Sequence, residues 1–338
     1  MSIERLLTGL FSNASADGTN YYYSRLNDEQ KKIYVSVQSG IRDCVKRIKL
    51  PMRPPNELSL IYRAVSADNP MFFYAAGFQW QTDAYKKQNI VFPDYEYSRA
   101  DINAHTNAVY AHLRIYDAVK NKSDREKEKF VHDYYSENFT YGDMGRVSHT
   151  ALGLVLHKTG VCEGIANYVK IVLEYLGVSS LVVSGKAKSS LCYDKMESHA
   201  WNIVRVDGLT YHLDVTFDMT IKDKLTRYDY FNLCDEDIRK DHIIVGDAPK
   251  CVTPGKDYYT FSDMTAQGKI GFENYIARKI RNGERTIIVK LTGEAQIKDI
   301  CDKVMQSAGQ VYMNVKNAGV SLEARCNQTQ MVFEINYK

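Results

Sequence analysis

The chain has 338 residues, of which 25% are charged, and its formal net charge is +3. Because acidic and basic residues alternate along the whole length, the sequence shows no basic tract of the kind that binds nucleic acid. A membrane-spanning helix needs roughly 20 consecutive apolar residues, and no stretch approaches that. We therefore expect neither nucleic acid nor a membrane as partner. The length exceeds what a single core usually supports, so we expect more than one domain.

The start of the chain and its cysteines predict the compartment. "MSIERLLTGLFSNASADG" has a short apolar patch that already carries Glu4, unlike a secretory signal with its basic start and long apolar centre. The cysteines are irregularly spaced, without a C-x-x-C pair: Cys44, Cys162, Cys192, Cys234, Cys251, Cys301 and Cys326. An odd number in this pattern predicts reduced thiols and a cytoplasmic location rather than a disulfide scaffold.

The first 100 residues read as one accessory domain. Residues 27–48 have apolar side chains three and four positions apart, which predicts a helix with Asn27 as its N-cap, ended by the prolines of "KLPMRPPNEL". Residues 69–97 contain two runs rich in aromatic and β-branched residues around a polar turn, which predicts a hairpin. We predict an N-terminal helix-and-hairpin domain over residues 1–100.

Two further segments frame the centre of the chain. Ser123 precedes Glu126 at the spacing of a capping box, and the mixed charges around them predict the solvated start of a helix over residues 124–137. After residue 262 the pattern predicts a helix stopped by Gly283, a strand, a helix stopped by Gly309 and a terminal hairpin. We therefore predict a central domain over residues 101–262 and a small C-terminal α+β domain over residues 263–338.

A single cysteine stands at the head of an apolar helical run in "TGVCEGIANYVKIVLEYLG", residues 159–177. The first N–H groups of a helix are unpaired and partly positive, so a thiolate is stabilised there and an oxyanion can be bound. We expect Gly160 to free the preceding turn from limits on φ, and Gly164 to let a strand or substrate approach. The alternative for Cys162 is a small buried side chain without chemistry.

The segment "SHAWNIVRVDGLTYHLDVTFD", residues 198–218, supplies two possible partners. Asp207 and Gly208 favour a two-residue hairpin loop, and the resulting register separates an apolar face from a polar one. The polar face carries Trp201 and His212, and on it His199 and Asp214 are diagonal neighbours about 7–8 Å apart. Cys162, His199 and Asp214 then form a nucleophile, a base and an orienting acid. Taken singly, His199 also fits a structural histidine and Asp214 a cap beside a turn.

Metal and cofactor sites are not indicated. Structural zinc sites usually pair their ligands at short spacing, and neither Cys162 and Cys192 nor His199 and His212 show such pairs. The sequence also contains no calcium-binding loop and no glycine-rich phosphate loop. We predict no metal and no cofactor. Cys192, in the polar loop before His199, is either a bystander or a redox partner that forms a disulfide with Cys162.

The motifs G-V-C-E-G (160–164), H-A-W-N (199–202) and D-V-T-F (214–217) resemble the transglutaminase-like superfamily of papain-like cysteine enzymes, in its bacterial form. With the flanks "FVHDYYSENFTYG" and "YDYFNLCDEDIRKDH", the resemblance covers about residues 120–243. It implies an α+β fold in which a helix headed by Cys162 packs against an antiparallel sheet, with α+β units on either side.

The same resemblance implies that Cys162 is the nucleophile, His199 the base and Asp214 the orienting acid, although Asp218 is a second carboxylate that could take that role. It implies acyl transfer on peptide or protein amides, and hydrolysis is favoured because nothing in the sequence marks a second site for an amine. A transglutaminase is one alternative. A peptide-binding module without activity is another. Backbone N–H groups near Cys162 are the only candidates for an oxyanion donor.

Overall fold

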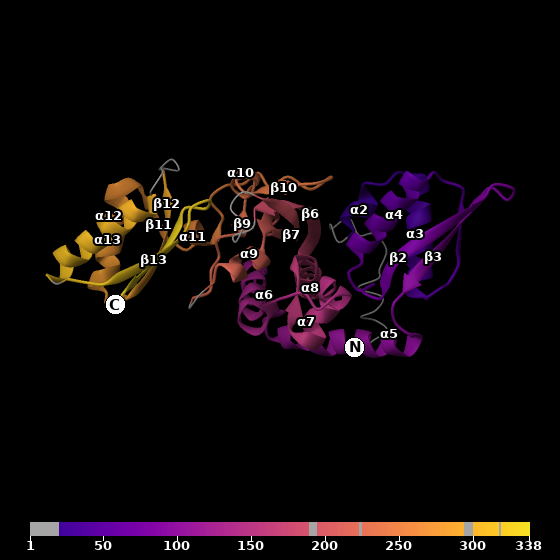
Figure 1. Cartoon of the computed structure of the whole chain (residues 1–338), viewed down its shortest axis with the longest axis horizontal. Helices are drawn as coiled ribbons and strands as arrows, with labels where there is room; N and C mark the ends of the chain where they lie inside the picture. Colours follow the sequence, from indigo (N-terminus) through magenta and orange to yellow (C-terminus); the bar gives the residue numbers. More distant parts are fainter. Residues whose placement is uncertain (1–19, 189–194, 223–224, 294–299, 318) are drawn as a thin grey trace. The chain divides into compact units, whose positions relative to one another are not determined.

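The computed structural model describes residues 20–188, 195–222, 225–293, 300–317 and 319–338. The chain divides into two compact units. The first comprises residues 1–185, 198–209 and 244–248, and the second residues 186–197, 210–243 and 249–338. Helices alternate with mainly antiparallel sheets, so the α+β prediction is confirmed (Figure 1). The opening 19 residues, on which part of the localisation argument rests, lie outside the described residues.

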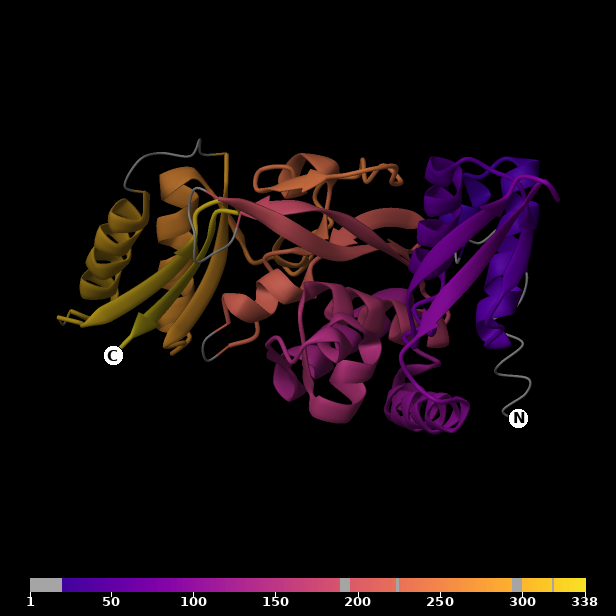
Figure 2. The ribbon, with the colours of Figure 1, turned by 45° about the vertical axis from the view of Figure 1, so that its right-hand side comes forward.

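The N-terminal part of the first unit contains α2 (Tyr21–Ser24), α3 (Asp28–Arg42), β1 (Ile48–Pro51), α4 (Pro55–Asp68), β2 (Ala75–Asp83) and β3 (Gln88–Tyr95). Its strands form an antiparallel sheet in the order β1-β3-β2, and in Figure 2 the long hairpin crosses in front of the indigo helices. The predicted N-cap Asn27, which also forms a capping box with Gln30, and the predicted hairpin are both confirmed. The helix ends at Arg42 rather than Ile48, because the chain turns back and the Ile48 side chain fills the space where Gly40 has no Cβ.

The remaining helices of the first unit lead to Cys162. They are α5 (Arg99–Leu113), η1 (Arg114–Val119), α6 (Asp124–Asn138), η2 (Arg146–His149), α7 (Ala151–His157) and α8 (Cys162–Tyr175). The capping box between Ser123 and Glu126 is confirmed at the start of α6. The short strands β4 (Thr140–Tyr141) and β5 (Thr159–Gly160) pair in parallel just before α8. Figure 1 shows α7 and α8 next to each other, in agreement with their contacts.

The central sheet has the order β10-β6-β7-β8-β9. Its strands are β6 (Ser179–Lys188), β7 (Met196–Val206), β8 (Leu209–Leu213), β9 (Phe231–Leu233) and β10 (His242–Ile244). The two-residue turn between β7 and β8 is confirmed, since Asp207 and Gly208 have φ angles of 52° and 80°. These left-handed values suit an Asp-Gly pair in a tight hairpin.

Two details of the predicted hairpin are wrong. β8 ends at Leu213, and Asp214 is the N-cap of α9 (Val215–Thr220) rather than a strand residue, because its side chain accepts the N–H of Phe217. The predicted separation into a buried and a polar face also fails, since Trp201 and His212, both assigned to the polar face, are fully buried. Both faces of this hairpin are therefore covered.

The C-terminal part of the second unit is a four-stranded sheet in the order β11-β12-β14-β13, with α12 and α13 sharing its apolar core. Its elements, with two short helices before them, are α10 (Asp235–Ile238), α11 (Tyr258–Phe261), β11 (Thr265–Gln267), α12 (Gly268–Arg281), β12 (Thr286–Thr292), α13 (Ile300–Lys316), β13 (Leu322–Asn327) and β14 (Val332–Tyr337). The helix stop before Gly283, the strand after it and the terminal hairpin are confirmed. The predicted stop at Gly309 is wrong, since α13 continues to Lys316. Gly309 instead leaves room for the Leu322 side chain, whose Cδ2 lies 3.2 Å from the position of a Cβ.

Two cysteines depart from the prediction of reduced thiols. Cys301 and Cys326 form a disulfide, whereas Cys44, Cys162, Cys234 and Cys251 are free. Disulfides persist in oxidising compartments, so this bond counts against a cytoplasmic location, which stays a prediction. Among the described residues, no helix is both long and apolar enough to cross a bilayer. The predicted domain boundaries at residues 100 and 262 also stay predictions.

Candidate active site

Cys162 is the first residue of α8, as predicted, and its side chain is half-buried. The preceding residue, Val161, donates its N–H to the carbonyl oxygen of Ser148 at 3.0 Å. The same carbonyl lies where a Cβ on Gly164 would be, at much less than the 3.0 Å that real Cβ atoms keep. The space beside Gly164, predicted for a strand or a substrate, is therefore filled by the chain's own turn η2.

Gly160 has a different role from the predicted one. It is absent from the residues with positive φ, so its turn does not require glycine for conformational reasons. The side chain of Leu154 occupies the space of its missing Cβ. Gly160 therefore allows the close approach of α7 just before the helix that carries Cys162.

Hydrogen bonds fix the turn η2 beside Cys162. The Ser148 hydroxyl lies 2.5 Å from the carbonyl of Gly145 and 3.0 Å from Asp143 Oδ1, and it accepts the N–H of Met144 at 3.1 Å. His149 Nδ1 lies 3.1 Å from an oxygen of Glu163, the residue after Cys162, and both side chains are exposed. The turn thus contacts the start of α8 in two ways: through the backbone carbonyl of Ser148 and through the side-chain pair of His149 and Glu163.

His199 lies on β7 with a half-buried side chain, and its ring stacks on that of Trp201 with centroids 5.8 Å apart. Ala200 and Asn202, the alternate residues of the same H-A-W-N motif, contact α8. Asn202 donates from Nδ2 to the carbonyl of Ala166 at 2.9 Å, and Ala200 packs against Ala166. Ala166 is one helical turn beyond Cys162, so these contacts fix the strand of His199 along the helix of Cys162.

Asp214 follows β8 and is 1% exposed. Its Oδ1 accepts the N–H of Phe217 at 3.0 Å, and its Oδ2 accepts a hydrogen bond from Nε2 of His242 at 3.0 Å. Sequence reasoning did not single out His242, although it ends the flank "YDYFNLCDEDIRKDH". Its adjacency to Asp241 was the only available signal, and no spacing rule links it to Asp214.

Asp218, the competing carboxylate, has a structural contact of its own. Its Oδ1 accepts the N–H of Tyr230 at 2.9 Å, while the N–H of Asp214 donates to the carbonyl of Tyr230 at 3.0 Å. The turn from Asp214 to Asp218 therefore holds the backbone of Tyr230 from both sides. Asp218 supports the segment before β9, whereas Asp214 directs an oxygen toward His242.

One set of possible metal ligands lies entirely within the second unit. Ligand atoms of His212, Asp235 and Cys251 are within 4.8 Å of one another. His212 Nε2 and Asp235 Oδ1 are joined directly at 2.9 Å, and burial lowers the pKa of His212 and raises that of Cys251 to about 12. A hydrogen-bonded, neutral ring and thiol account for these distances. The absence of a metal stays a prediction, and Cys192, the suggested redox partner, lies outside the described residues.

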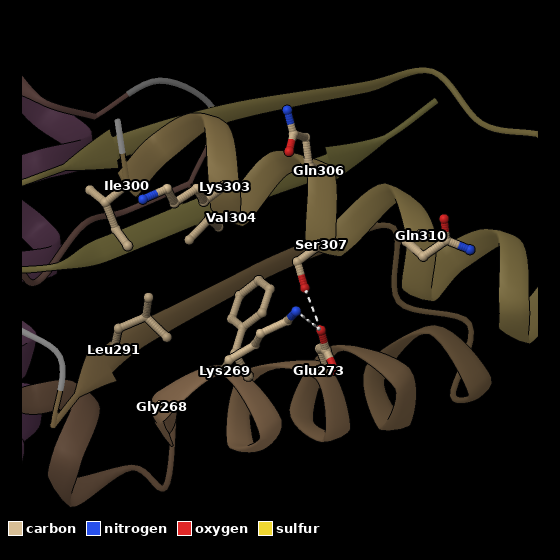
Figure 3. A pocket seen from close by; sticks show the side chains of 11 residues that line it. Gly268, Lys269, Glu273, Leu291, Ile300, Lys303, Val304, Gln306, Ser307 and Gln310 are labelled. Carbon is tan, nitrogen blue, oxygen red and sulfur yellow. Dashed lines mark hydrogen bonds and ion pairs between the residues drawn. The ribbon is translucent and has the colours of Figure 1, made fainter. Parts of the chain in front are cut away.

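A separate cavity of about 490 Å³ lies between α12 and α13 (Figure 3). Apolar side chains such as Phe272 and Val304 line it, and Glu273 contacts Ser307 at 3.1 Å and Lys269 at 3.8 Å. Glu273 is thus paired with both of these polar neighbours. None of the predicted catalytic residues lines this cavity.

Residues 113–214 match the transglutaminase-like superfamily. The matched segment runs from the end of α5 to Asp214 and contains Cys162 and His199. No curated protein matches the chain.

Three solved structures are similar in part. A crystal structure of a TGase is 15% identical, with 53% of this chain and 53% of that chain covered and a TM-score of 0.32. A provisionally named cysteine protease from Cytophaga hutchinsonii is 13% identical (42% and 62% covered, TM-score 0.28). A provisionally named protease from Parabacteroides distasonis is 16% identical (40% and 30% covered, TM-score 0.24). The chain thus spans less than two thirds of each.

Proposed function

We propose that this chain is a cysteine-nucleophile acyl-transfer enzyme that acts on peptide or protein amides. Cys162 is the nucleophile, His199 the general base and Asp214 the acid that orients it. The observation that carries the proposal is the docking of the His199 strand on α8 through Asn202 and Ala166, one turn from Cys162. This contact ties the base to the helix that presents the thiol.

The position of Asp214 supports the third role. It follows β8, the neighbour of β7 in the sheet order, and β7 carries His199. A buried carboxylate that orients an imidazole holds the tautomer required for proton transfer and stabilises the imidazolium that forms. The match of residues 113–214 to the transglutaminase-like superfamily also supports this assignment.

The reaction would proceed in two steps. The Cys162 thiolate attacks the amide carbonyl carbon, and the C–N bond breaks as the His199 imidazolium gives its proton to the leaving amine. The acyl group is then held as a thioester on Cys162. An acceptor attacks the thioester while His199 takes its proton, and the thiolate leaves. The free N–H groups at the start of α8 are the candidates for stabilising the oxyanion of both steps.

The acceptor separates the two enzymatic alternatives. Water would make the protein a peptidase or amidase, which we favour, and a primary amine would make it a transglutaminase. Incubation of a glutamine-containing peptide with and without an added amine, followed by mass spectrometry, distinguishes them. We expect hydrolysed product in both samples. An amine adduct that dominates when amine is present would assign transglutaminase activity instead.

The nucleophile can be tested without a known substrate. Limiting iodoacetamide at about pH 6, where an ordinary thiol is almost entirely protonated, should alkylate Cys162 before the other cysteines. Cys44 is the internal control, because it is also free and half-buried. We expect Asp214→Asn to slow the labelling of Cys162 and leave that of Cys44 unchanged. If Cys44 is labelled first in the native protein, the catalytic assignment is wrong and the binding-module alternative is favoured.

A further inference from the structure

His242 lies at the centre of a buried polar network in the second unit. Its Nε2 is 3.0 Å from Asp214 Oδ2, and its Nδ1 is 2.6 Å from Asp241 Oδ1. The other oxygen of Asp241 accepts the hydroxyl of Tyr230 at 2.6 Å. The side chains of His242 and Asp214 are 0% exposed. Both nitrogens of one imidazole therefore face carboxylate oxygens in a site without access to solvent.

This geometry favours a charged ring. A neutral imidazole has a single N–H, so its second nitrogen would place a lone pair against a carboxylate oxygen, whereas an imidazolium donates from both nitrogens. Burial disfavours the charge on His242, but the hydrogen bonds that its ring donates to Asp214 and Asp241, together with the charges of these carboxylates, outweigh burial and raise the pKa of His242 above its ordinary value. Arg227, another buried cation of this unit, is already paired with Asp229 and Glu334. His242 is thus the cation that contacts both Asp214 and Asp241.

The ring is also fixed in orientation. Its centroid lies 4.6 Å from the ring of Phe217 and 5.6 Å from that of Tyr230. Among the described residues of the unit, His212 is a further ionisable group that acts on His242, and its charge would oppose that of His242. Phe217 also supplies the N–H that holds the first oxygen of Asp214. The carboxylate of Asp214 is therefore held at both oxygens, by α9 and by His242.

We propose that His242 is the positioning residue of Asp214: a buried imidazolium, held by Asp241 and Tyr230, that fixes the carboxylate which orients His199. This inference rests on the proposed function, since it concerns the orienting acid of that site. His242 does not touch the reacting atoms. It acts by fixing the rotamer of Asp214 through Oδ2 and by keeping that carboxylate ionised inside the protein.

The test compares variants of two buried histidines. His242→Ala removes the contact with Asp214, and His242→Gln keeps a side-chain N–H that can donate to it. His212→Ala is the matched control, because His212 is also fully buried and also paired with a carboxylate, Asp235. Each variant is labelled at Cys162 with iodoacetamide from pH 5 to 9, and its thermal unfolding is followed by circular dichroism.

We expect His242→Ala to slow the labelling of Cys162 at pH 6 by about 10–100-fold, by analogy with residues that orient the ligands of a metal site. His242→Gln should recover most of that rate, and His212→Ala should lower the unfolding temperature while leaving the labelling and its pH profile unchanged. ¹⁵N NMR of the histidine rings should show both nitrogens of His242 protonated at pH 7, with the signals assigned by their loss in His242→Gln.

The outcomes separate the two proposals. If the wild-type protein does not label Cys162 selectively, the proposed function fails, and this inference with it. If the wild type labels selectively but His242→Ala has the same rate and pH profile, only the positioning role is wrong. Equal slowing in His212→Ala would also overturn it, because the effect would then be general destabilisation. A single protonated nitrogen on His242 at pH 7 would refute the imidazolium.

Discussion

The close contact between Gly164 and Ser148 predicts that Gly164→Ala destabilises the protein, whereas replacing a helical glycine by alanine usually stabilises it. In an exposed helix, replacing glycine by alanine gains about 1 kcal/mol of helix propensity. At Gly164 a Cβ would meet the carbonyl oxygen of Ser148 and lie 3.0 Å from that of Thr150, and both atoms belong to the backbone. They cannot rotate away as the end of a flexible side chain can. The turn η2 or the start of α8 must therefore shift.

The change in the free energy of unfolding can be estimated from the separate contributions. Overpacking of a filled site costs about 1–3 kcal/mol, and a shift of η2 also weakens the 3.0 Å hydrogen bond from Val161 N–H to Ser148, worth about 1 kcal/mol. Against the gain in propensity, Gly164→Ala should lower the free energy of unfolding by about 1–3 kcal/mol. Because η2 also contacts the residue after Cys162, we expect slower alkylation of Cys162 as well.

Gly271→Ala in α12 is the matched control. The nearest atom to its new Cβ would be the backbone carbon of Ala266 at 3.7 Å, which is an ordinary contact. This variant should therefore gain up to about 1 kcal/mol. Urea unfolding can be followed by the fluorescence of the buried Trp201 for Gly164→Ala and by circular dichroism for Gly271→Ala. A Gly164→Ala protein as stable as the wild type would refute the close approach of Ser148.

Two other predictions concern pH and oxidation. Burial and the charge of Lys158 lower the pKa of His112 to about 4, so this ring stays neutral beside the Tyr168 hydroxyl at 2.7 Å. Between pH 6.5 and 4 the unfolded chain then binds more protons than the folded one, so the free energy of unfolding falls as the pH falls. In His112→Gln, the urea midpoint should depend less on pH across this range. The disulfide between Cys301 and Cys326 closes a sequence separation of 25 residues, so Cys326→Ser should cost about 3.5 kcal/mol in the unfolding of the second unit. An unchanged pH dependence in the first case, or an unchanged midpoint under non-reducing conditions in the second, would contradict these assignments.

Local features of the fold were predictable from the sequence because their causes are local. The capping boxes at Asn27 and Ser123 satisfy helix N–H groups within three residues, and the Asp207-Gly208 turn depends on two φ angles. The helix start at Cys162 follows from the apolar periodicity after it. Such signals need no knowledge of the rest of the chain.

Other features depend on contacts between distant segments, which give no local pattern in the sequence. Gly309 looks like a helix stop, but it lies in mid-helix, where the side chain of Leu322 on β13 packs close to it. The disulfide joins cysteines whose pairing cannot be deduced from spacing alone. For the candidate site, the motifs indicated its three proposed members, whereas the contact of His242 with Asp214 spans 28 residues and arises only from the fold.

The buried carboxylates of Asp214, Asp218 and Asp241 are stabilised by different partners. A carboxylate that stays ionised in a buried site needs hydrogen-bond donors or a cation, because desolvation otherwise favours its protonated form. Tyr230 meets part of this need, since its N–H donates to Asp218 and its hydroxyl to Asp241. Asp214 is held by the Phe217 N–H and by His242. If the base of the reaction gains and loses a proton beside Asp214, a cation bound to that carboxylate weakens the attraction of Asp214 for the proton. His242 can supply that balance while remaining outside the reaction itself.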